Sequence, residues 1–357
     1  MEDNITEDIY KYVQRFTDER TLITIGSGIS SAEGIPGMNE LAEELIKNVP
    51  KSLLFKEDDS LKWKKIELSL KEGTDLETSL SGERLNSNLD DIIKQVTYNY
   101  LKKYNEDLLQ EVLTRAHKLK IESLLKKLTP RTTKELVVIT TNYDCLIEYA
   151  CAMLEIDVDT LFYGAYIKKF NPSLLRQQHM KYTGNKSKSQ KKINYNFVKL
   201  LKPHGSLDWH SLSPNSDNII STELNSPETV EMITPGISKY IRERREPFNK
   251  VYNLCNEEID NAGQYIFLGY GFNDKDLEDH YEHIENRNKP MLIITKDLTK
   301  NINELYSKRN TIMLIYSNES GSNIKYKQSG EENKIHMDNN LWDIEILTKK
   351  IFNGEDN

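Results

Sequence analysis

Residues 21–37, TLITIGSGISSAEGIPG, decide the fold of this chain. The first five form a short apolar run, which predicts a buried strand. Gly26, Ser27 and Gly28 interrupt the run, and small residues then lead to a helix that we expect to begin near Asn39 as its N-cap. A strand, a glycine turn and a helix in this order can bring backbone N–H groups close to a phosphate. Taken alone, the same pattern also fits an ordinary tight turn.

Composition narrows the class of protein. The 357 residues are enough for one large domain or two modest ones, and 37% hydrophobic residues predict a packed core. The net charge of −8 argues against direct binding of nucleic acid. Three cysteines without CxxC spacing cannot form a four-cysteine zinc site, and they fit a reduced compartment. The sequence shows no signal peptide and no apolar run of about 18 residues, so we expect a cytoplasmic protein without a membrane span.

Six short apolar runs alternate with segments of helical periodicity. This alternation predicts an α/β protein with a Rossmann-like, doubly wound parallel sheet of about six strands. The six runs cover residues 21–25, 135–140, 197–201, 265–268, 291–295 and 311–316.

Other segments interrupt or follow this pattern. Residues of about 50–130 are rich in lysine and glutamate and have helical periodicity, which predicts a helical insertion. The basic stretch of about 168–192 is typical of a mobile surface loop, or of a loop that binds an anion or a partner. We expect one domain over residues 1–320 and a polar C-terminal tail over 321–357, with room for a short helix.

Small or polar residues follow four of the predicted strands. Because the carboxyl ends of parallel strands share one edge of a sheet, where ligands bind, we expect the four groups to meet at one site. Each group also has a plainer interpretation: an asparagine can cap a helix, a lone histidine is usually structural, and glycines form turns. Four such groups at four strand ends are harder to explain by chance. They are Gly26-Ser27-Gly28, Thr141-Asn142-Tyr143-Asp144, His204-Gly205-Ser206 and Gly269-Tyr270-Gly271.

The same four segments resemble the motifs of sirtuin-like domains. Residues 21–37 are similar to the GAGxS…GIP nucleotide loop, and TTNYD at 140–144 is similar to the asparagine–aspartate motif. KPHGSLDW at 202–209 resembles the catalytic histidine motif, and IFLGYGFND at 266–274 resembles the late glycine segment that contacts the cofactor. The motifs follow the family order over residues 20–316. The resemblance is to the bacterial branch of sirtuin-like NAD-degrading proteins found in anti-phage defence systems.

Departures from the family pattern disfavour a protein deacylase. Deacylase sirtuins carry a zinc module built from four cysteines, which this chain cannot form. Thr141 stands in place of the glutamine of the TQNID motif, and Ser27 replaces the middle residue of GAG. Gly37 and Asn39 replace an acid and an arginine. These changes put deacylase activity in doubt, but they leave the expectation of NAD binding unchanged. Without the zinc cysteines, we expect no metal site.

The resemblance implies roles for particular residues. Asn142 can orient a water or a ribose hydroxyl through its amide, and His204 can act as a general base because histidine titrates near neutral pH. Backbone and hydroxyl donors over residues 26–30 would hold the pyrophosphate. The implied NAD-binding residues are Gly26, Ser27, Gly28, Ser30, Thr141, Asp144, Gly269, Gly271 and Phe272.

The predicted function is that of an NAD glycohydrolase, which uses NAD as its substrate and releases nicotinamide and ADP-ribose. By resemblance it would be a regulated effector that depletes NAD. Its control would come from homo-oligomerisation or from a separate partner, such as a translocase-type ATPase, an Argonaute-like protein or a nucleotide-sensing protein. Three alternatives stay open: a sensor or assembly subunit that binds NAD or ADP-ribose without cleaving it, an NAD-dependent protein deacylase, and an ADP-ribosyltransferase.

Overall fold

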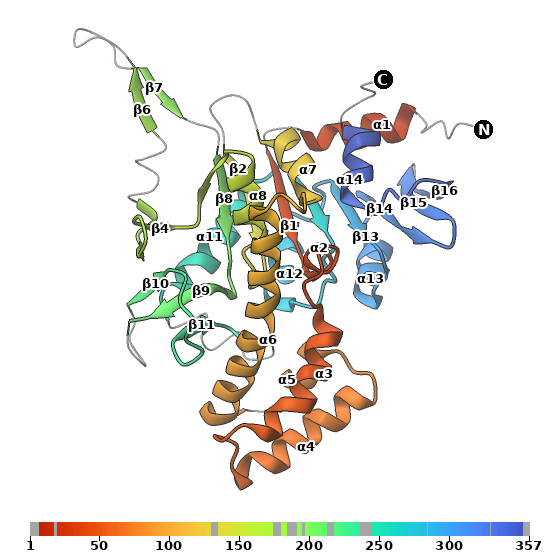
Figure 1. Ribbon diagram of the computed structural model, residues 1–357. Coiled ribbons are helices and arrows are strands. Elements are labelled where there is room, and N and C mark those ends of the chain that lie inside the picture. The colour runs from red at the N-terminus through yellow and green to blue at the C-terminus, as the bar shows by residue number, and fades with distance from the viewer. Residues whose placement is uncertain are drawn as a thin grey trace.

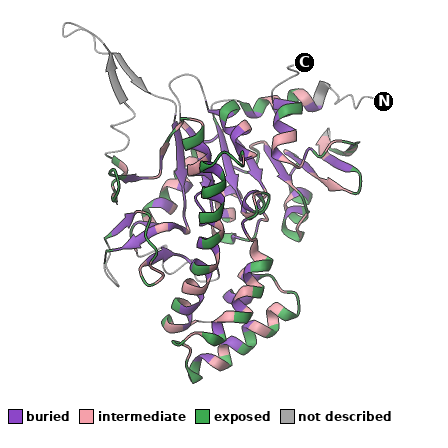
Figure 2. Cartoon of the chain, viewed as in Figure 1, coloured by how far each residue is buried: buried purple, intermediate pink, exposed green. Residues whose placement is uncertain are grey.

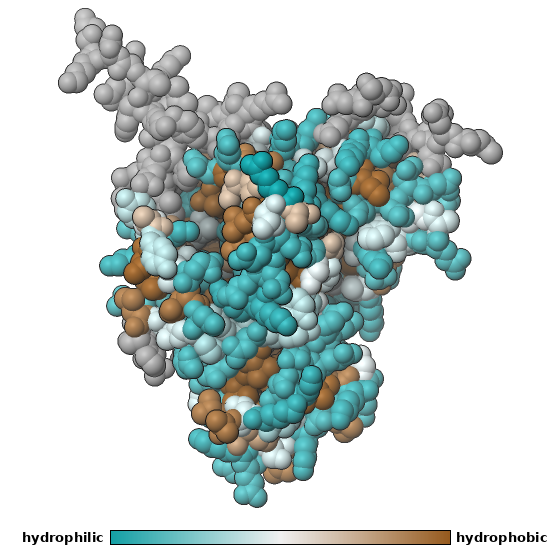
Figure 3. Space-filling view, in the orientation of Figure 1, coloured by the Kyte–Doolittle hydropathy of each residue, from teal (hydrophilic) through white to brown (hydrophobic). Residues whose placement is uncertain are grey.

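A computed structural model of the chain shows a central sheet with helices on both faces (Figure 1). It describes residues 7–17, 20–83, 85–129, 135–173, 180–183, 191–194, 197–212, 218–235, 245–283, 285–328 and 330–352. Hydrophilic residues cover most of the face seen in Figure 3. Among the described helices, none is long and apolar enough to cross a membrane.

The central sheet has nine strands in the order β16-β15-β14-β13-β12-β1-β2-β8-β3. Seven of them are parallel, and six of these seven are the predicted strands, so the predicted Rossmann-like α/β fold is confirmed. The strand order reverses at β1. The chain first adds β2 and β8 on one side of β1, and it later adds β12 and β13 on the other side. Ligands of such sheets bind at the carboxyl edge of this switch point. The seven parallel strands are β1 (Thr21–Ile25), β2 (Glu135–Thr140), β3 (Asp157–Asp159), β8 (Phe197–Leu201), β12 (Gln264–Leu268), β13 (Met291–Thr295) and β14 (Ile312–Asn318).

The C-terminal residues complete this sheet, and the expectation of a polar tail after residue 320 is wrong. Strands β15 (Gly321–Gln328) and β16 (Glu331–Met337) form an antiparallel hairpin that pairs with β14. The short helix expected near the end is present as α14 (Ile344–Leu347), followed by a π-helical turn (Thr348–Phe352). Most side chains of β16 are at least partly exposed. The segment therefore lacks the apolar signal of a strand, and backbone pairing with β15 places it.

Alternate side chains of the parallel strands point to opposite faces and build two cores. Ile23 of β1 faces a first layer of helices, and Leu22 faces the second layer. In Figure 2 the strands in the middle of the central sheet are almost entirely buried, whereas the helices expose their outer sides. The first layer holds α1 (Glu7–Gln14), the C-terminal part of α6 (Ser87–Leu113), α7 (Ile121–Leu128), α8 (Leu146–Met153) and α14, and the second holds α11 (Phe248–Asn261), α12 (Lys275–Tyr281) and α13 (Lys300–Lys308).

A helical subdomain lies beyond the carboxyl edge of the sheet, at the bottom of Figure 1. It contains α3 (Met38–Asn48), α4 (Glu57–Lys71), α5 (Leu76–Ser81) and the first half of α6. These helices share a separate apolar core that includes Leu45, Trp63, Leu80 and Ile93. Most of the segment predicted as a helical insertion therefore forms this subdomain, whereas the rest of α6 and α7 pack on the sheet.

The start of α3 differs from the prediction. Residues that were expected to be a loop contain the short helix α2 (Ser27–Ser31), directly after the glycine turn. The N-cap of α3 is Gly37, not Asn39, because the Glu40 carboxylate accepts a hydrogen bond from the Gly37 amide at 3.1 Å. A carboxylate in this position satisfies an amide that the helix leaves unpaired.

A second, antiparallel sheet of five strands was not predicted. Four of its strands have only two or three residues, too short for a periodic pattern to show, and the seven residues of β9 include only two large apolar side chains, Leu207 and Trp209. The described part of the predicted basic loop holds β5 (Lys168–Phe170) and a separate pair, β6 (Met180–Thr183) and β7 (Lys191–Asn194). Residues 174–179 and 184–190 lie outside the described residues. The second sheet has the order β11 (Val230–Met232), β9 (Gly205–Ser211), β10 (Ile219–Ser221), β5 (Lys168–Phe170) and β4 (Phe162–Tyr163).

Candidate active site

A pocket of about 820 Å³, its open mouth included, lies at the carboxyl edge of the central sheet. The turns that follow β1, β2 and β12 line it, together with His204 from the turn after β8. The helical subdomain closes the opposite side with Met38, Leu41 and Glu77, and Leu101 from the part of α6 that packs on the sheet lies beside them. The four predicted groups of small and polar residues thus meet at one site.

Eight of the eleven predicted site residues line this pocket. Phe272 does not, because it packs against Phe267 with ring centroids 4.6 Å apart and is buried in the core below the pocket. Gly28 and Gly269 are also absent from the lining. The residues that line the pocket are Gly26, Ser27, Ser30, Thr141, Asn142, Asp144, His204 and Gly271.

Gly28 and Gly269 let two turns cross at contact distance. A Cβ atom on Gly28 would lie 2.8 Å from the Gly269 Cα, and Gly269 has a φ of +54°. The Gly26 amide donates to the Leu268 carbonyl at 3.0 Å, and the Gly28 amide donates to the Gly269 carbonyl at 3.0 Å. These two amides hold the end of β1 against the end of β12. The expectation that they bind the pyrophosphate is therefore corrected, since their hydrogen bonds are already made within the protein.

Asn142 is oriented by hydrogen bonds from its side-chain NH₂ group. This group donates to the Gly26 carbonyl at 3.0 Å and to the Ser30 hydroxyl at 2.8 Å. Ser30 in turn donates to the Asp144 carboxylate at 2.7 Å. Because a carbonyl only accepts, the amide nitrogen must face Gly26, and the amide oxygen Oδ1 is the atom left for a ligand. Within the described residues, no hydrogen bond to Oδ1 is made.

A tight turn carries His204 into the pocket. The Gly205 amide donates to the Lys202 carbonyl at 3.1 Å, and the His204 carbonyl accepts from the Ile233 amide at 2.9 Å. Gly205 is needed here, because its φ is +81° and a Cβ atom would lie 2.4 Å from the Glu231 carbonyl oxygen. The His204 side chain is 11% exposed.

Sequence reasoning missed a carboxylate that faces this histidine. Asp274 Oδ2 lies 2.9 Å from His204 Nε2, at ion-pair distance, although the two atoms are not aligned for a hydrogen bond. Asp274 is the N-cap of α12, and its Oδ1 accepts from the Leu277 amide at 3.4 Å. The available signal was an aspartate in an N-cap position, at the end of the GYGFND segment and directly before a short helix that buries Leu277 and Tyr281.

Glu278 lies beside this pair and is protonated more easily than an ordinary glutamate. Its carboxylate accepts from the Asp274 amide at 2.9 Å and from the Tyr270 hydroxyl at 3.4 Å. Burial, and secondly the nearby Asp274 carboxylate, raise the pKa of Glu278 to about 8.

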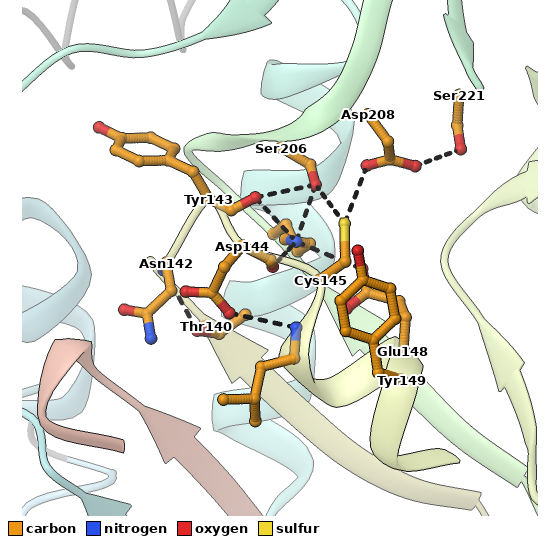
Figure 4. A network of polar contacts seen from close by, with 12 residues as sticks. Thr140, Asn142, Tyr143, Asp144, Cys145, Glu148, Tyr149, Ser206, Asp208 and Ser221 are labelled. Atoms are coloured by element: carbon orange, nitrogen blue, oxygen red, sulfur yellow. Dashed lines mark hydrogen bonds and ion pairs between the residues drawn. The ribbon is translucent and has the colours of Figure 1, made fainter. Parts of the chain in front are cut away.

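Behind the pocket, a network of polar contacts supports the turn after β2 (Figure 4). The Lys202 ammonium donates to the Asp144 carbonyl at 2.6 Å, to the Ser206 hydroxyl at 2.8 Å and to the Glu148 carboxylate at 3.2 Å. Burial by itself would lower the pKa of Lys202, but Glu148 and further negative neighbours outweigh it and raise the pKa above its ordinary value. Lys202 is therefore a buried cation at neutral pH. Burial also raises the pKa of the Cys145 thiol well above its usual range, so this cysteine is not an activated nucleophile.

None of the three cysteines forms a disulfide, and all three are buried. Among the residues that the structure describes, no group of three or more histidine, cysteine, aspartate or glutamate side chains could hold a metal ion.

Comparison with known proteins assigns the chain to a family. A family model described as a SIR2-like domain matches residues 136–315, which is half of the chain. The chain belongs to this SIR2-like family, and the sirtuin-like resemblance is confirmed. Membership of the family points to a domain that binds or processes NAD. No curated protein matches the chain.

Solved structures of Sir2 proteins are similar to the chain at low sequence identity. A mutant Sir2 homologue in complex with ADP-ribose is 15% identical, over 84% of this chain and 88% of that one, with a TM-score of 0.41. A triple mutant in complex with 2′-O-acetyl ADP-ribose is 14% identical over the same shares, with a TM-score of 0.40. A structure of a Sir2 enzyme titled for its mechanism and regulation is 12% identical, over 86% and 92% of the two chains, with a TM-score of 0.39.

Proposed function

We propose that the protein is an NAD glycohydrolase, which cleaves the bond between nicotinamide and ribose in NAD with water. The observation that carries this proposal is that Asn142 and His204, from two different turns, line the same pocket as the glycine turn after β1. Binding alone would need neither a positioned amide oxygen nor a histidine. Hydrolysis of NAD needs both a positioned nucleophile and a group that accepts its proton.

Cleavage of NAD needs little help from an acid catalyst, because the leaving group does not have to be protonated. When the C1′–N bond breaks, its electron pair returns to the ring nitrogen, so the positively charged pyridinium leaves as neutral nicotinamide. A water oxygen then forms the new bond to C1′, and the proton of that water must go to a base. The products are nicotinamide, ADP-ribose and one proton.

The lining residues suit these steps. Asn142 Oδ1 would accept a hydrogen bond from the attacking water or from a ribose hydroxyl, and His204 would take the proton. Among the described residues, the lining includes no lysine or arginine. We therefore assign the pyrophosphate to hydroxyl donors such as Ser27 and Thr141. The carboxylate of Glu77 suits the positive charge of the pyridinium and of the oxocarbenium-like centre that follows.

We further propose that the enzyme depletes NAD as an effector in anti-phage defence, under the control of a second copy or a partner protein. Because uncontrolled NAD loss would kill the host, activity must be restrained. The helical subdomain supplies Met38, Leu41 and Glu77 to the pocket. A partner that shifts this subdomain would change the pocket, and the partner candidates remain a translocase-type ATPase, an Argonaute-like protein or a nucleotide-sensing protein.

The test is nicotinamide release from NAD by the purified protein, beside the variants His204→Ala and His336→Ala. We expect turnover in the wild type and in His336→Ala, whose histidine lies in the exposed β16, and loss of turnover in His204→Ala. NAD binding is measured in the same samples by calorimetry. Consumption that needs an acyl-lysine peptide would instead indicate a deacylase, and transfer of ADP-ribose to protein a transferase. Binding without turnover, even with candidate partners added, would indicate a sensor.

A further inference from the structure

We propose that Asp274 is a positioning residue that sets the tautomer and orientation of His204. Its effect on turnover rests on the proposed function, whereas its effect on the histidine ring does not. The two side chains come from different elements, the turn before α12 and the turn after β8, and meet at 2.9 Å between Oδ2 and Nε2. Both line the pocket. Asp274 itself is 5% exposed.

The carboxylate of Asp274 is held in place from two sides. Its Oδ1 accepts the N-cap hydrogen bond from Leu277, and its own backbone amide donates to Glu278. The backbone of His204 is fixed as well, through the turn that ends at Gly205 and the hydrogen bond from Ile233. The two side chains therefore start from backbone positions that cannot move apart without breaking hydrogen bonds. A functional group held in this manner by a second set of contacts is pre-organised for its task.

This arrangement selects one tautomer of the imidazole. An ionised carboxylate only accepts hydrogen bonds, so the nitrogen that faces it, Nε2, carries the hydrogen. Nδ1 is then the nitrogen with a free electron pair and takes the proton of the nucleophile. The imidazolium that forms lies against a negative charge, which stabilises it. The present misalignment of the contact is compatible with this role, because catalytic hydrogen bonds often tighten only when the substrate is bound.

Asp274→Asn separates this role from that of the helix cap. Asparagine caps helices as well as aspartate does, so its oxygen would remain with Leu277. Its NH₂ group would then face His204 and donate to Nε2, which moves the ring hydrogen to Nδ1 and removes the base. We expect kcat to fall by roughly 10²- to 10⁴-fold with KM within about threefold, as expected for a wrong tautomer. The control is Asp279→Asn, an exposed position on the same helix, which should keep wild-type kcat.

The ring itself gives a readout that needs no turnover. Protein labelled with ¹⁵N-histidine is studied by NMR, and the His204 signals are those that His204→Ala removes. The proposal predicts the Nε2–H tautomer in the wild type and the Nδ1–H tautomer in Asp274→Asn. An Nδ1–H tautomer in the wild type, or the same tautomer in both proteins, would overturn it, as would an unchanged kcat. If the tautomer inverts but neither protein hydrolyses NAD, the positioning role stands and the proposed hydrolase function fails.

Discussion

At the scale of single residues, the site depends on side chains that never face the pocket. Lys202 is 2% exposed, yet its ammonium binds the backbone of the turn that carries Asn142 and Asp144. It also neutralises the carboxylate of Glu148. Removing one partner of a buried ion pair leaves an uncompensated charge, which costs more than the pair itself contributes.

Replacement of Lys202 by methionine should therefore destabilise the protein strongly. We expect the free energy of unfolding to fall by about 3–5 kcal/mol, because the Glu148 carboxylate loses its cation and the Asp144 carbonyl loses its donor. Urea unfolding followed by circular dichroism measures this loss. Lys300→Met serves as control, since the Lys300 side chain is 88% exposed and should change stability by no more than about 0.5 kcal/mol. A loss below about 1 kcal/mol in Lys202→Met would contradict the role given to the network.

Glu278 predicts a pH dependence of stability. Its pKa is about 8 in the folded protein, against an ordinary value of 4.5. Between these two values the unfolded chain binds fewer protons than the folded one, so the free energy of unfolding falls as pH rises through this window.

Glu278→Gln keeps an oxygen that can accept hydrogen bonds from Asp274 and Tyr270, but removes the titration. Its melting temperature should exceed that of the wild type by an amount that grows from pH 5 to pH 8. Parallel melting curves for the two proteins would refute this, and Glu304→Gln, at a half-exposed position, is the control.

At the scale of elements, the site depends on how closely the turns after β1 and β12 approach each other. The contact is made by backbone atoms of Gly28 and Gly269, which cannot move aside as the end of a side chain can. The crossing also uses the Gly26 and Gly28 amides as structural donors. Gly28 and Gly269 are thus required because the two turns pack against each other, whether or not these residues also contact a ligand.

Gly28→Ala should disrupt this crossing. The added Cβ would lie 2.8 Å from the Gly269 Cα, so we expect a loss of about 1–3 kcal/mol in unfolding free energy, together with weaker NAD binding. Gly82→Ala is a matched control, because its φ is −66° and its nearest neighbour, the Thr78 carbonyl oxygen, lies at 3.5 Å. The control should remain within about 0.5 kcal/mol of the wild type. Denaturant unfolding and calorimetric titration with NAD report the two effects, and equal stability of the two variants would argue against the crossing.

At the scale of the whole molecule, two parts of the described chain line the pocket from opposite sides. The sheet provides the turns with Asn142 and His204, and the helical subdomain provides the opposite wall with Glu77. We propose that a partner acts on this site by changing the position of the helical subdomain.

Expression of the protein in its active, unrestrained form in a bacterial host should be toxic if it is an NAD glycohydrolase. We expect cellular NAD to fall after induction of the active wild type and growth to stop, because hydrolysis consumes NAD faster than synthesis replaces it. His204→Ala, produced at the same level, should leave both NAD and growth unchanged. NAD is quantified in cell extracts by an enzymatic cycling assay. Equal toxicity of the two proteins would show that the effect does not come from NAD depletion.

The sequence by itself determined the six parallel strands and the residues at their carboxyl ends. Both are local signals: buried strands are continuous apolar runs, and the turns need glycine or a polar side chain at a given point. It also determined the family, because the asparagine and histidine motifs are short and contiguous. These signals can be identified without knowing what packs against them.

Only the tertiary structure decided how these pieces meet. The antiparallel sheet is built largely from strands of two or three residues, and the hairpin β15–β16 is held by backbone pairing although most side chains of β16 are polar and at least partly exposed, so neither has the apolar pattern of a buried strand. The contact between His204 and Asp274 and the burial of Phe272 also depend on where separate turns end in space. The Gly26 and Gly28 amides are a further example, since a free donor and a bonded one look the same in sequence. The physical reason is that hydrogen bonds and burial belong to pairs of groups, whereas a sequence pattern describes one segment at a time.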